Sequence, residues 1–140
     1  KGRHRQAMSK QVFIHLPVAD VVKSRAFFEG IGFTLNPNCS GEHSACLAFS
    51  ETIHVMLSAH EQFKQFSPKP ICDTSKALEV LLCLQCESRG EVDDMATKAV
   101  AAGATDAETT DYGFMYQRSF IDLDGHGWAL NFMSDSPPQG

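Results

Sequence analysis

One order of predicted elements occurs twice along the 140-residue chain. Each half predicts a strand, a capped helix and three further strands, with Asp20 capping the first helix and Ser88 the second. The predicted strands cover residues 11–18, 33–35, 45–50 and 53–58, and then residues 78–86, 104–107, 114–121 and 128–133. The two caps are 68 residues apart, about half of the chain. The sequence therefore predicts an α+β fold made of two βαβββ modules.

The last predicted hairpin shows how such a module is organised. Between Arg118 and Phe132, two apolar runs flank the segment 122–125, where aspartates can bond their own backbone and Gly125 can adopt positive φ. Strand alternation then sorts the following side chains by size. The small ones are Gly127, Ala129 and Asn131, and the large ones are Trp128, Leu130 and Phe132. We expect a helix to cover the large face and the small face to border a cavity or a partner.

The expected boundaries follow from these elements. Residues 1–7 resemble a tag remnant because the strand pattern begins only after them. We expect a single domain over 8–133, with module one at 11–58, a linker at 59–76 and module two at 77–133. The linker carries a short helix that could act as a lid. Residues 134–140 are expected to form a flexible tail.

Charge and hydropathy exclude two classes of partner. The chain has 12 basic and 17 acidic residues, and without residues 1–7 the basic count falls to nine, a net charge of about −8. This balance argues against nucleic acid or an anionic membrane as a partner. No apolar run reaches the roughly 18 to 20 residues that a membrane-spanning helix needs.

The five cysteines are an odd number at irregular spacings, which suits a reducing compartment, and we expect a cytoplasmic protein. Cys83 and Cys86 have the spacing of a zinc or redox motif. They lie in a predicted strand, however, where residues three apart point to opposite faces. We therefore predict small core residues rather than a metal or redox pair.

The duplicated order resembles the vicinal oxygen chelate superfamily, on segments 16–20, 27–33 and 122–126. That group includes glyoxalases, bleomycin resistance proteins and extradiol dioxygenases. The likeness covers residues 11–133 and implies two βαβββ modules whose curved mixed sheets enclose a cavity, commonly in a homodimer. One fold hosts several functions here, so the resemblance alone does not select one.

The family's enzymes hold a divalent metal on four inward strand positions. The resemblance carries these positions onto Phe13, Met56, Leu81 and Ala129. None of them offers the imidazole or carboxylate that such a cation prefers. We therefore predict no metal cofactor, with a divalent metal ion as the alternative.

Two histidines share the strand parity of these positions. If Phe13 lies level with Met56, His15 and His54 are separated by about 13 Å along the sheet, at about 3.3 Å per residue. Zinc ligands must come within about 2.0 to 2.1 Å of the ion. We therefore predict that the two histidines do not share an ion, unless the register of the fourth strand differs by two residues.

What remains is a cavity for a small organic molecule, with an apolar floor and polar groups around it. The candidate ligand-binding residues are Phe13, His15, His54, Met56, Tyr116, Gln117, Ser119 and Asn131. Parity puts Tyr116 and Arg118 on the helix side, where Arg118 suits a structural ion pair. A twist beside Gly113 could still turn Tyr116 into the cavity mouth. His126 is expected at the surface and Trp128 in the core.

The sequence leaves three hypotheses. The first is a glyoxalase- or bleomycin-resistance-like protein that binds a small molecule without metal. The second is a metal-dependent lyase of the lactoylglutathione lyase type, or a dioxygenase. The third is a structural or interaction module with a filled cavity. No nucleophile elbow, zinc-protease helix or phosphate-binding glycine loop is present, so whether the protein is an enzyme stays open. The family habit favours a homodimer.

Overall fold

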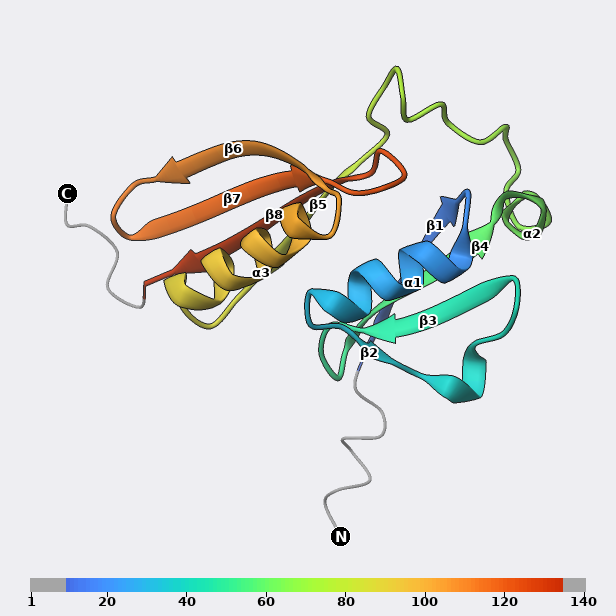
Figure 1. Cartoon of the computed structure of the whole chain (residues 1–140), viewed down its shortest axis with the longest axis horizontal. Helices are drawn as coiled ribbons and strands as arrows, with labels where there is room; N and C mark the ends of the chain where they lie inside the picture. The colour runs from blue at the N-terminus through green and yellow to red at the C-terminus, as the bar shows by residue number, and fades with distance from the viewer. Residues whose placement is uncertain (1–9, 135–140) are drawn as a thin grey trace, which may run out of the picture. The chain divides into compact units, whose positions relative to one another are not determined.

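The computed structural model describes residues 10–134. The chain divides between Ile71 and Cys72 into two compact units, each with its own sheet and helix (Figure 1). The proposed tag remnant at 1–7 and all but the first residue of the proposed tail lie outside the described residues.

The first unit contains a four-stranded sheet in the order β1-β4-β3-β2. β1 pairs in parallel with β4, and the other neighbours are antiparallel. Its elements are β1 (Val12–Val18), α1 (Val21–Gly30), β2 (Thr34–Leu35), the 3-10 turn η2 (Pro37–Cys39), β3 (Ser44–Ala48), β4 (Ile53–Ala59) and α2 (His60–Lys64).

The second unit repeats this arrangement with a sheet in the order β5-β8-β7-β6. β5 is parallel to β8, as β1 is to β4, and the remaining neighbours are antiparallel. Its elements are β5 (Leu81–Gln85), α3 (Arg89–Ala101), β6 (Thr105–Asp111), β7 (Met115–Ile121) and β8 (Gly127–Met133). The predicted α+β fold with two βαβββ modules is confirmed.

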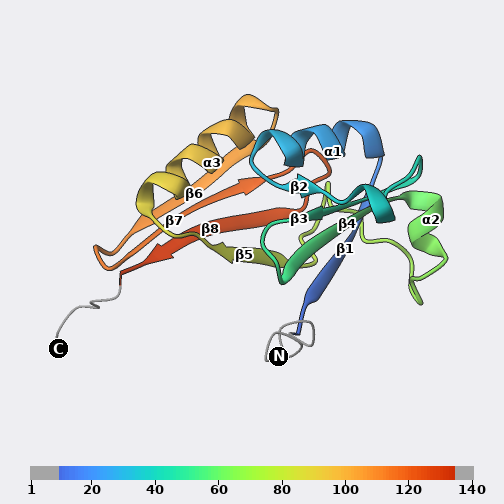
Figure 2. The ribbon, with the colours of Figure 1, turned by 90° about the horizontal axis from the view of Figure 1, so that it is seen from below.

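Each long helix covers one face of its own sheet, α1 over β3 and β4 and α3 over β7 and β8 (Figure 2). The predicted caps form, because Asp20 accepts a bond from the Lys23 amide and Ser88 from the Glu91 amide. Trp128 is buried in the second core, as predicted. In both units, the opposite face of the sheet is left without a long helix.

The sequence pattern predicts Val22, Ala26 or Phe27, and Gly30 or Ile31 on the buried face of α1, and this is confirmed for Phe27 and Ile31 but wrong for Val22. Val22 is 71% exposed, whereas the side chains that face the sheet are those of Val21, Ser24, Phe27 and Phe28. Phe28 packs edge-on against Phe27 and Phe33, with ring centroids 4.9 and 5.2 Å apart. This aromatic cluster fixes the rotation of the helix, which the 3.6-residue period alone does not determine. In α3, the buried residues are Val92, Met95, Ala96 and Ala99, whereas the neighbouring Val100 is exposed.

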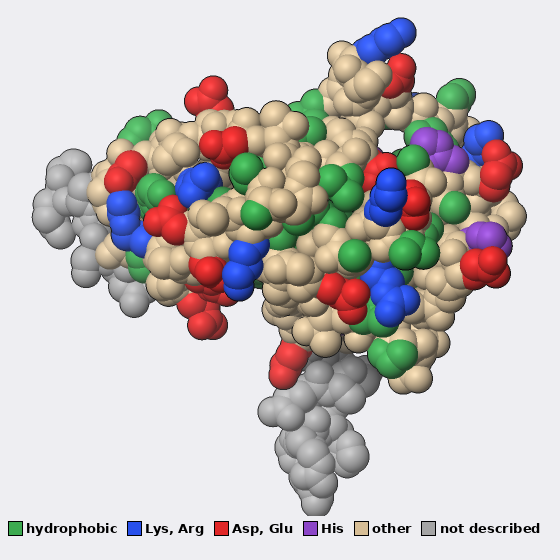
Figure 3. Space-filling view, in the orientation of Figure 1, with side chains coloured by type: hydrophobic (Ala, Val, Ile, Leu, Met, Phe, Trp, Pro, Cys, Tyr) green, Lys and Arg blue, Asp and Glu red, His purple; other side chains and the backbone are tan. Residues whose placement is uncertain are grey.

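The outer surfaces of α1 and α3 are polar. Acidic and basic side chains are interspersed on the surface shown in Figure 3. The ion pairs on the two helices are Arg25–Glu29 on α1 and Lys98–Asp94 on α3. Among residues 10–134, no helix is long and apolar enough to cross a membrane. The helix side of each unit therefore faces solvent, and the candidate sites lie on the opposite faces.

Candidate functional site

The face of the first sheet that α1 leaves uncovered carries four predicted ligand-binding residues. We call Phe13, His15, His54 and Met56 the first open face. All four have the parity opposite to the helix-facing residues Leu16, Val55 and Leu57, which are at most 3% exposed. Phe13 is 51% exposed, and its ring stacks on that of His54 with centroids 4.5 Å apart and an interplanar angle of 10°. The predicted parity of these residues is confirmed.

The predicted register between β1 and β4 is wrong by two residues. Phe13 lies opposite His54, and His15 lies opposite Met56. His15 and His54 are therefore offset by two residues on adjacent strands, about 7 Å along the sheet, rather than the predicted 13 Å. Such diagonal neighbours lie within reach of long side chains. The distance between the two imidazoles therefore no longer excludes a shared metal ion.

His54 is fixed by the groups around its ring. Its Nε2 lies 2.6 Å from the Gln11 side-chain oxygen and 3.2 Å from the Glu51 carbonyl oxygen. Both partners are acceptors, so Nε2 carries the proton and donates. Nδ1 is buried and has no hydrogen-bond partner among residues 10–134. The ring therefore offers its flat surface rather than its Nδ1 atom to the first open face.

The second sheet also has an uncovered face, which is more polar. Gln117 and Ser119 of β7 lie opposite Asn131 and Ala129 of β8, and Cys83 of β5 lies on the other side of Ala129. The Cys83 Sγ lies 3.8 Å from the Gln117 Oε1. The two carried-over metal positions of this unit are not level, because Leu81 lies opposite Gly127 and Ala129 lies opposite Cys83. The structure brings Gln117, Ser119 and Asn131 to one surface of the second unit.

Tyr116 does not join that surface. Its hydroxyl donates a 2.5 Å hydrogen bond to Asp93 of α3, and the guanidinium of Arg89 lies 4.3 Å from its ring centroid. The hydrogen bond to Asp93 raises the pKa of Tyr116. The twist that would have turned Tyr116 toward a cavity does not occur, so it is not retained as a ligand contact.

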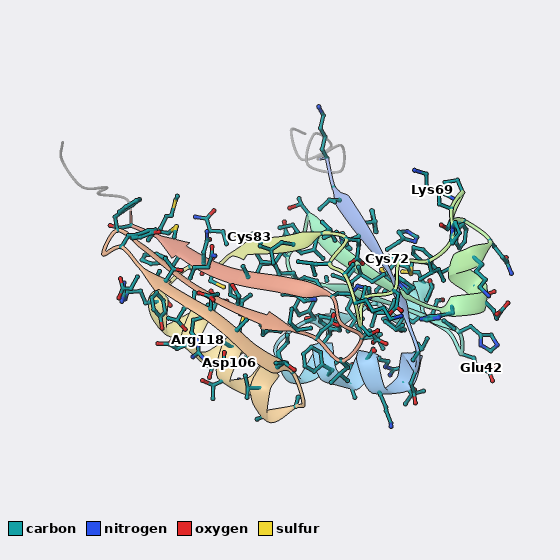
Figure 4. All side chains as sticks on the ribbon, turned by 90° about the horizontal axis from the view of Figure 1, so that it is seen from above. Glu42, Lys69, Cys72, Cys83, Asp106 and Arg118 are labelled. Atoms are coloured by element: carbon teal, nitrogen blue, oxygen red, sulfur yellow. The ribbon has the colours of Figure 1, made fainter. Side chains whose placement is uncertain are left out.

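Arg118 shares the helix side with Tyr116. Its guanidinium lies 3.5 Å from Asp93 and from Asp106 (Figure 4). The predicted structural ion pair is confirmed.

The two cysteines with zinc-motif spacing point to opposite faces, as predicted, but the predicted core position is confirmed only for Cys86 and is wrong for Cys83. Cys83 is exposed on the uncovered face, whereas Cys86 is 3% exposed. Burial raises the pKa of Cys86 to about 12, and partial desolvation by neighbouring groups raises the pKa of Cys83. Both thiols are therefore protonated at neutral pH and are poor nucleophiles.

A cavity of about 350 Å³ lies beside the first open face. It is lined by His15 of β1, Phe63 of α2, and Phe66, Ser67 and Pro68 of the following turn. The sequence indicated a lid helix here but did not select its aromatic residues as a site. The sequence feature that could have indicated this site is the presence of two phenylalanines and a proline in the predicted linker. Apolar residues there have no predicted core to fill.

A buried polar cluster holds the β7–β8 turn. Asp122 accepts bonds from the Trp128 indole, the Asp124 amide and the His126 amide, at 2.8, 2.9 and 3.0 Å. The predicted surface position of His126 is wrong, because His126 is 1% exposed and its Nδ1 lies 3.0 Å from a carboxylate oxygen of Glu79. The residues before β5 fold over the turn and cover it, a contact that no local pattern encodes.

The family's divalent metal does not fit the residues present. Phe13, Leu81 and Ala129 offer hydrocarbon, and Met56 offers a weak thioether ligand. On the first open face, only His15 and the buried Nδ1 of His54 are nitrogen donors. A catalytic zinc usually takes three protein ligands. No group of three or more His, Cys, Asp or Glu side chains within residues 10–134 is placed to hold an ion.

Metal analysis should therefore find far less than one divalent ion per chain in protein purified without chelators. EDTA should leave the melting temperature unchanged, because no described ligand set links an ion to folding. Elemental analysis by plasma mass spectrometry measures the first and thermal unfolding the second. About one tightly held ion per chain, lost in His15→Ala, would contradict the donor count.

The two repeated units have the architecture of the vicinal oxygen chelate superfamily, and solved structures bear this out. No protein-family model and no curated protein matches the chain. A glyoxalase/bleomycin resistance protein/dioxygenase family enzyme from Burkholderia phytofirmans PsJN is 21% identical, with a TM-score of 0.71, covering 89% of this chain and 99% of its own. Hypothetical protein SA1046 from S. aureus is 27% identical at a TM-score of 0.71, covering 95% and 99%.

TnmS3, an antibiotic binding protein from Streptomyces sp. CB03234, is 22% identical at a TM-score of 0.64, covering 91% of this chain and 98% of its own. The chain thus has the glyoxalase/bleomycin resistance/dioxygenase fold, and the resemblance to the vicinal oxygen chelate superfamily is confirmed at the level of the fold.

Proposed function

We propose that this protein binds a small organic molecule on its first open face, without the metal that enzymes of this superfamily use. The observation that carries the proposal is the Phe13–His54 pair. An aromatic ring that is half exposed and stacked on an imidazole offers a flat apolar surface, and Met56 provides an adaptable apolar neighbour. His15, which is exposed on the same face, supplies a polar contact that orients a ligand.

Two further observations support binding over the alternatives. The cavity of about 350 Å³ beside His15 lies within the roughly 300 to 1,000 Å³ range of small-molecule sites, which a filled structural module would lack. A protein with the same fold, TnmS3, is an antibiotic binding protein. Gln117, Ser119 and Asn131 remain proposed polar contacts on the second unit. Action as a cytoplasmic homodimer stays a prediction.

Replacing Phe13 by alanine should weaken small-molecule binding about fivefold or more, because it removes the exposed stacking surface. The measurement is a chemical-shift titration of ¹⁵N-labelled protein with a library of neutral aromatic and aliphatic fragments. Binding fragments should shift the amides of Val12–Leu16 and Ile53–Leu57 in the wild type.

Val22→Ala is the matched control, because Val22 is an exposed apolar residue on the outer side of α1. It should leave every fragment affinity within about twofold, since no proposed contact is lost. If no fragment shifts the first open face, or if Phe13→Ala binds as well as Val22→Ala, the proposed function is wrong.

A further inference from the structure

The cavity beside α2 is built by a short segment with a fixed backbone. Gln65 and Phe66 donate backbone hydrogen bonds to the Gln62 and Phe63 carbonyls, at 3.1 and 3.0 Å, and the Ser67 amide donates to Phe63 at 3.1 Å. Pro68 then limits the backbone further. These bonds hold the turn after α2 in one conformation. The cavity wall formed by Phe63, Phe66, Ser67 and Pro68 is therefore preformed in this structure.

The side chains on this wall are exposed although they are apolar. Phe66 is 69% exposed, and Phe63 is half-buried. α2 contacts β1 and β4, so the wall stands beside the same sheet that carries the first open face. Leaving a phenylalanine ring in water forgoes the stabilisation that burial would give, and such rings mark binding surfaces when they line a concavity.

The cavity has one polar group that is available to a ligand. The His15 ring meets Phe66 edge-on, with centroids 6.0 Å apart and an interplanar angle of 68°. His15 is exposed and lines this cavity, so its ring is open to a ligand. The Ser67 hydroxyl, by contrast, already donates to the Lys69 carbonyl. One imidazole among aromatic and proline rings suits a neutral ring system with a single hydrogen-bonding atom.

We infer that this cavity is a binding pocket for a flat, neutral heteroaromatic ring, which lies between Phe63, Phe66 and Pro68 and is bonded by His15. The inference rests on the proposed function and extends it, because it adds a pocket for an aromatic part of the ligand under the α2 segment, beside the surface that the Phe13–His54 pair provides. It also assigns the α2 segment a role in recognition. A flat ring is favoured over a saturated one because aromatic walls gain stacking energy only from a planar partner.

The test uses quinoline, a planar bicycle with one acceptor nitrogen, and 2-decalone, a saturated bicycle with one acceptor oxygen. Each is titrated into ¹⁵N-labelled full-length protein and followed by amide chemical shifts. We expect saturable shifts centred on Phe63–Pro68 and His15 with quinoline, and binding about tenfold weaker with 2-decalone.

Substitutions separate stacking from general apolarity. Phe66→Ala and Phe66→Leu should each weaken quinoline binding about fivefold or more, because leucine is apolar but not flat. Tyr112→Ala is the matched control, since Tyr112 is an aromatic residue of similar exposure, 67%, in the second unit. It should leave the affinity unchanged. A retained amide spectrum in each variant shows that the fold persists.

Several outcomes would overturn the inference. Quinoline shifts that centre on Phe13 and Met56, with Phe66→Ala binding as the wild type does, would leave the proposed function standing and remove the pocket. Equal affinity for 2-decalone, or full binding by Phe66→Leu, would remove the preference for a flat ring. No saturable binding of quinoline at millimolar concentration would reject the pocket, whereas the fragment titration of Phe13→Ala tests the proposed function independently.

Discussion

Asp122→Ala should lower the free energy of unfolding by about 2–4 kcal/mol. The buried carboxylate accepts three hydrogen bonds, and the donors left behind include the indole of Trp128, which is 1% exposed. An unsatisfied buried donor loses its hydration without gaining a partner. Urea denaturation followed by circular dichroism measures the loss. No ligand is required.

Asp94→Ala is the control for this substitution. The Asp94 side chain is 61% exposed on α3 and pairs with Lys98 at 3.0 Å. An exposed pair of this kind contributes little, so the control should stay within about 0.5 kcal/mol of the wild type. Asp122→Asn should be intermediate, because its oxygen can still accept from the two backbone amides while its NH₂ faces the Trp128 donor. Equal stability of Asp122→Ala and Asp94→Ala would contradict the assigned role.

The same group predicts a pH dependence with a definite sign. Burial raises the pKa of Asp122, although its hydrogen bonds and the neighbouring His126 oppose the shift. The folded protein therefore binds this proton more tightly than the unfolded chain does. The stabilisation of the folded state that results from this tighter proton binding is fully present below the ordinary aspartate pKa. It is lost as pH rises through the raised pKa of Asp122. The stability advantage of wild type over Asp122→Asn should accordingly be larger at low pH than at neutral pH.

Strand parity is the part of the candidate site that the sequence predicts well. Alternation places Phe13, His15, His54 and Met56 on one face because each side chain follows its own backbone pleat. The same rule correctly separates Cys83 from Cys86. The helix caps and the turn are also predicted correctly from the sequence. The reason is that Asp20, Ser88 and the 122–125 turn interact with their immediate neighbours in the chain. These features are local, so a single sequence contains the information for them.

Register between strands is a different kind of fact. β1 and β4 are more than thirty residues apart in the chain, and their alignment depends on how the intervening helix and strands fold rather than on either strand's composition. A shift of two residues preserves parity, so the hydrophobic pattern cannot detect it. The predicted 13 Å separation of His15 and His54 failed for this reason. The donor count on the first open face does not depend on register, and it still argues against a metal.

Burial of turn residues is equally nonlocal. His126 is polar and follows a glycine turn, which is typical of a surface position. It is buried because the segment 73–79 folds back over the turn. The Glu79 carboxylate bonds the His126 imidazole, and the Thr74 hydroxyl donates to the Asp124 carbonyl. No spacing or periodicity in the sequence couples this segment to a turn about fifty residues later.

Gly125→Ala should cost about 2–5 kcal/mol and loosen the segment that precedes β5. Gly125 has φ of 85°, and a Cβ there would lie 2.8 Å from the Thr74 carbonyl oxygen and 2.8 Å from its hydroxyl oxygen. The hydroxyl could rotate away, but the backbone oxygen cannot move without the segment. Urea denaturation measures the cost, and hydrogen exchange should quicken at the Lys76 and Ala77 amides, which bond the Asp73 carbonyl.

Gly113→Ala separates the two causes of this effect. Gly113 also has φ of 85°, but a Cβ at this position would have no atom within 4 Å. The Gly113→Ala variant therefore has only the backbone strain of an alanine with positive φ, about 1 kcal/mol. It has no steric clash like that between the added Cβ at position 125 and Thr74. The exchange of Lys76 and Ala77 should not change in this variant. If both substitutions cost the same and neither alters that exchange, backbone strain alone is the cause, and close contact with Thr74 does not hold the segment on the turn.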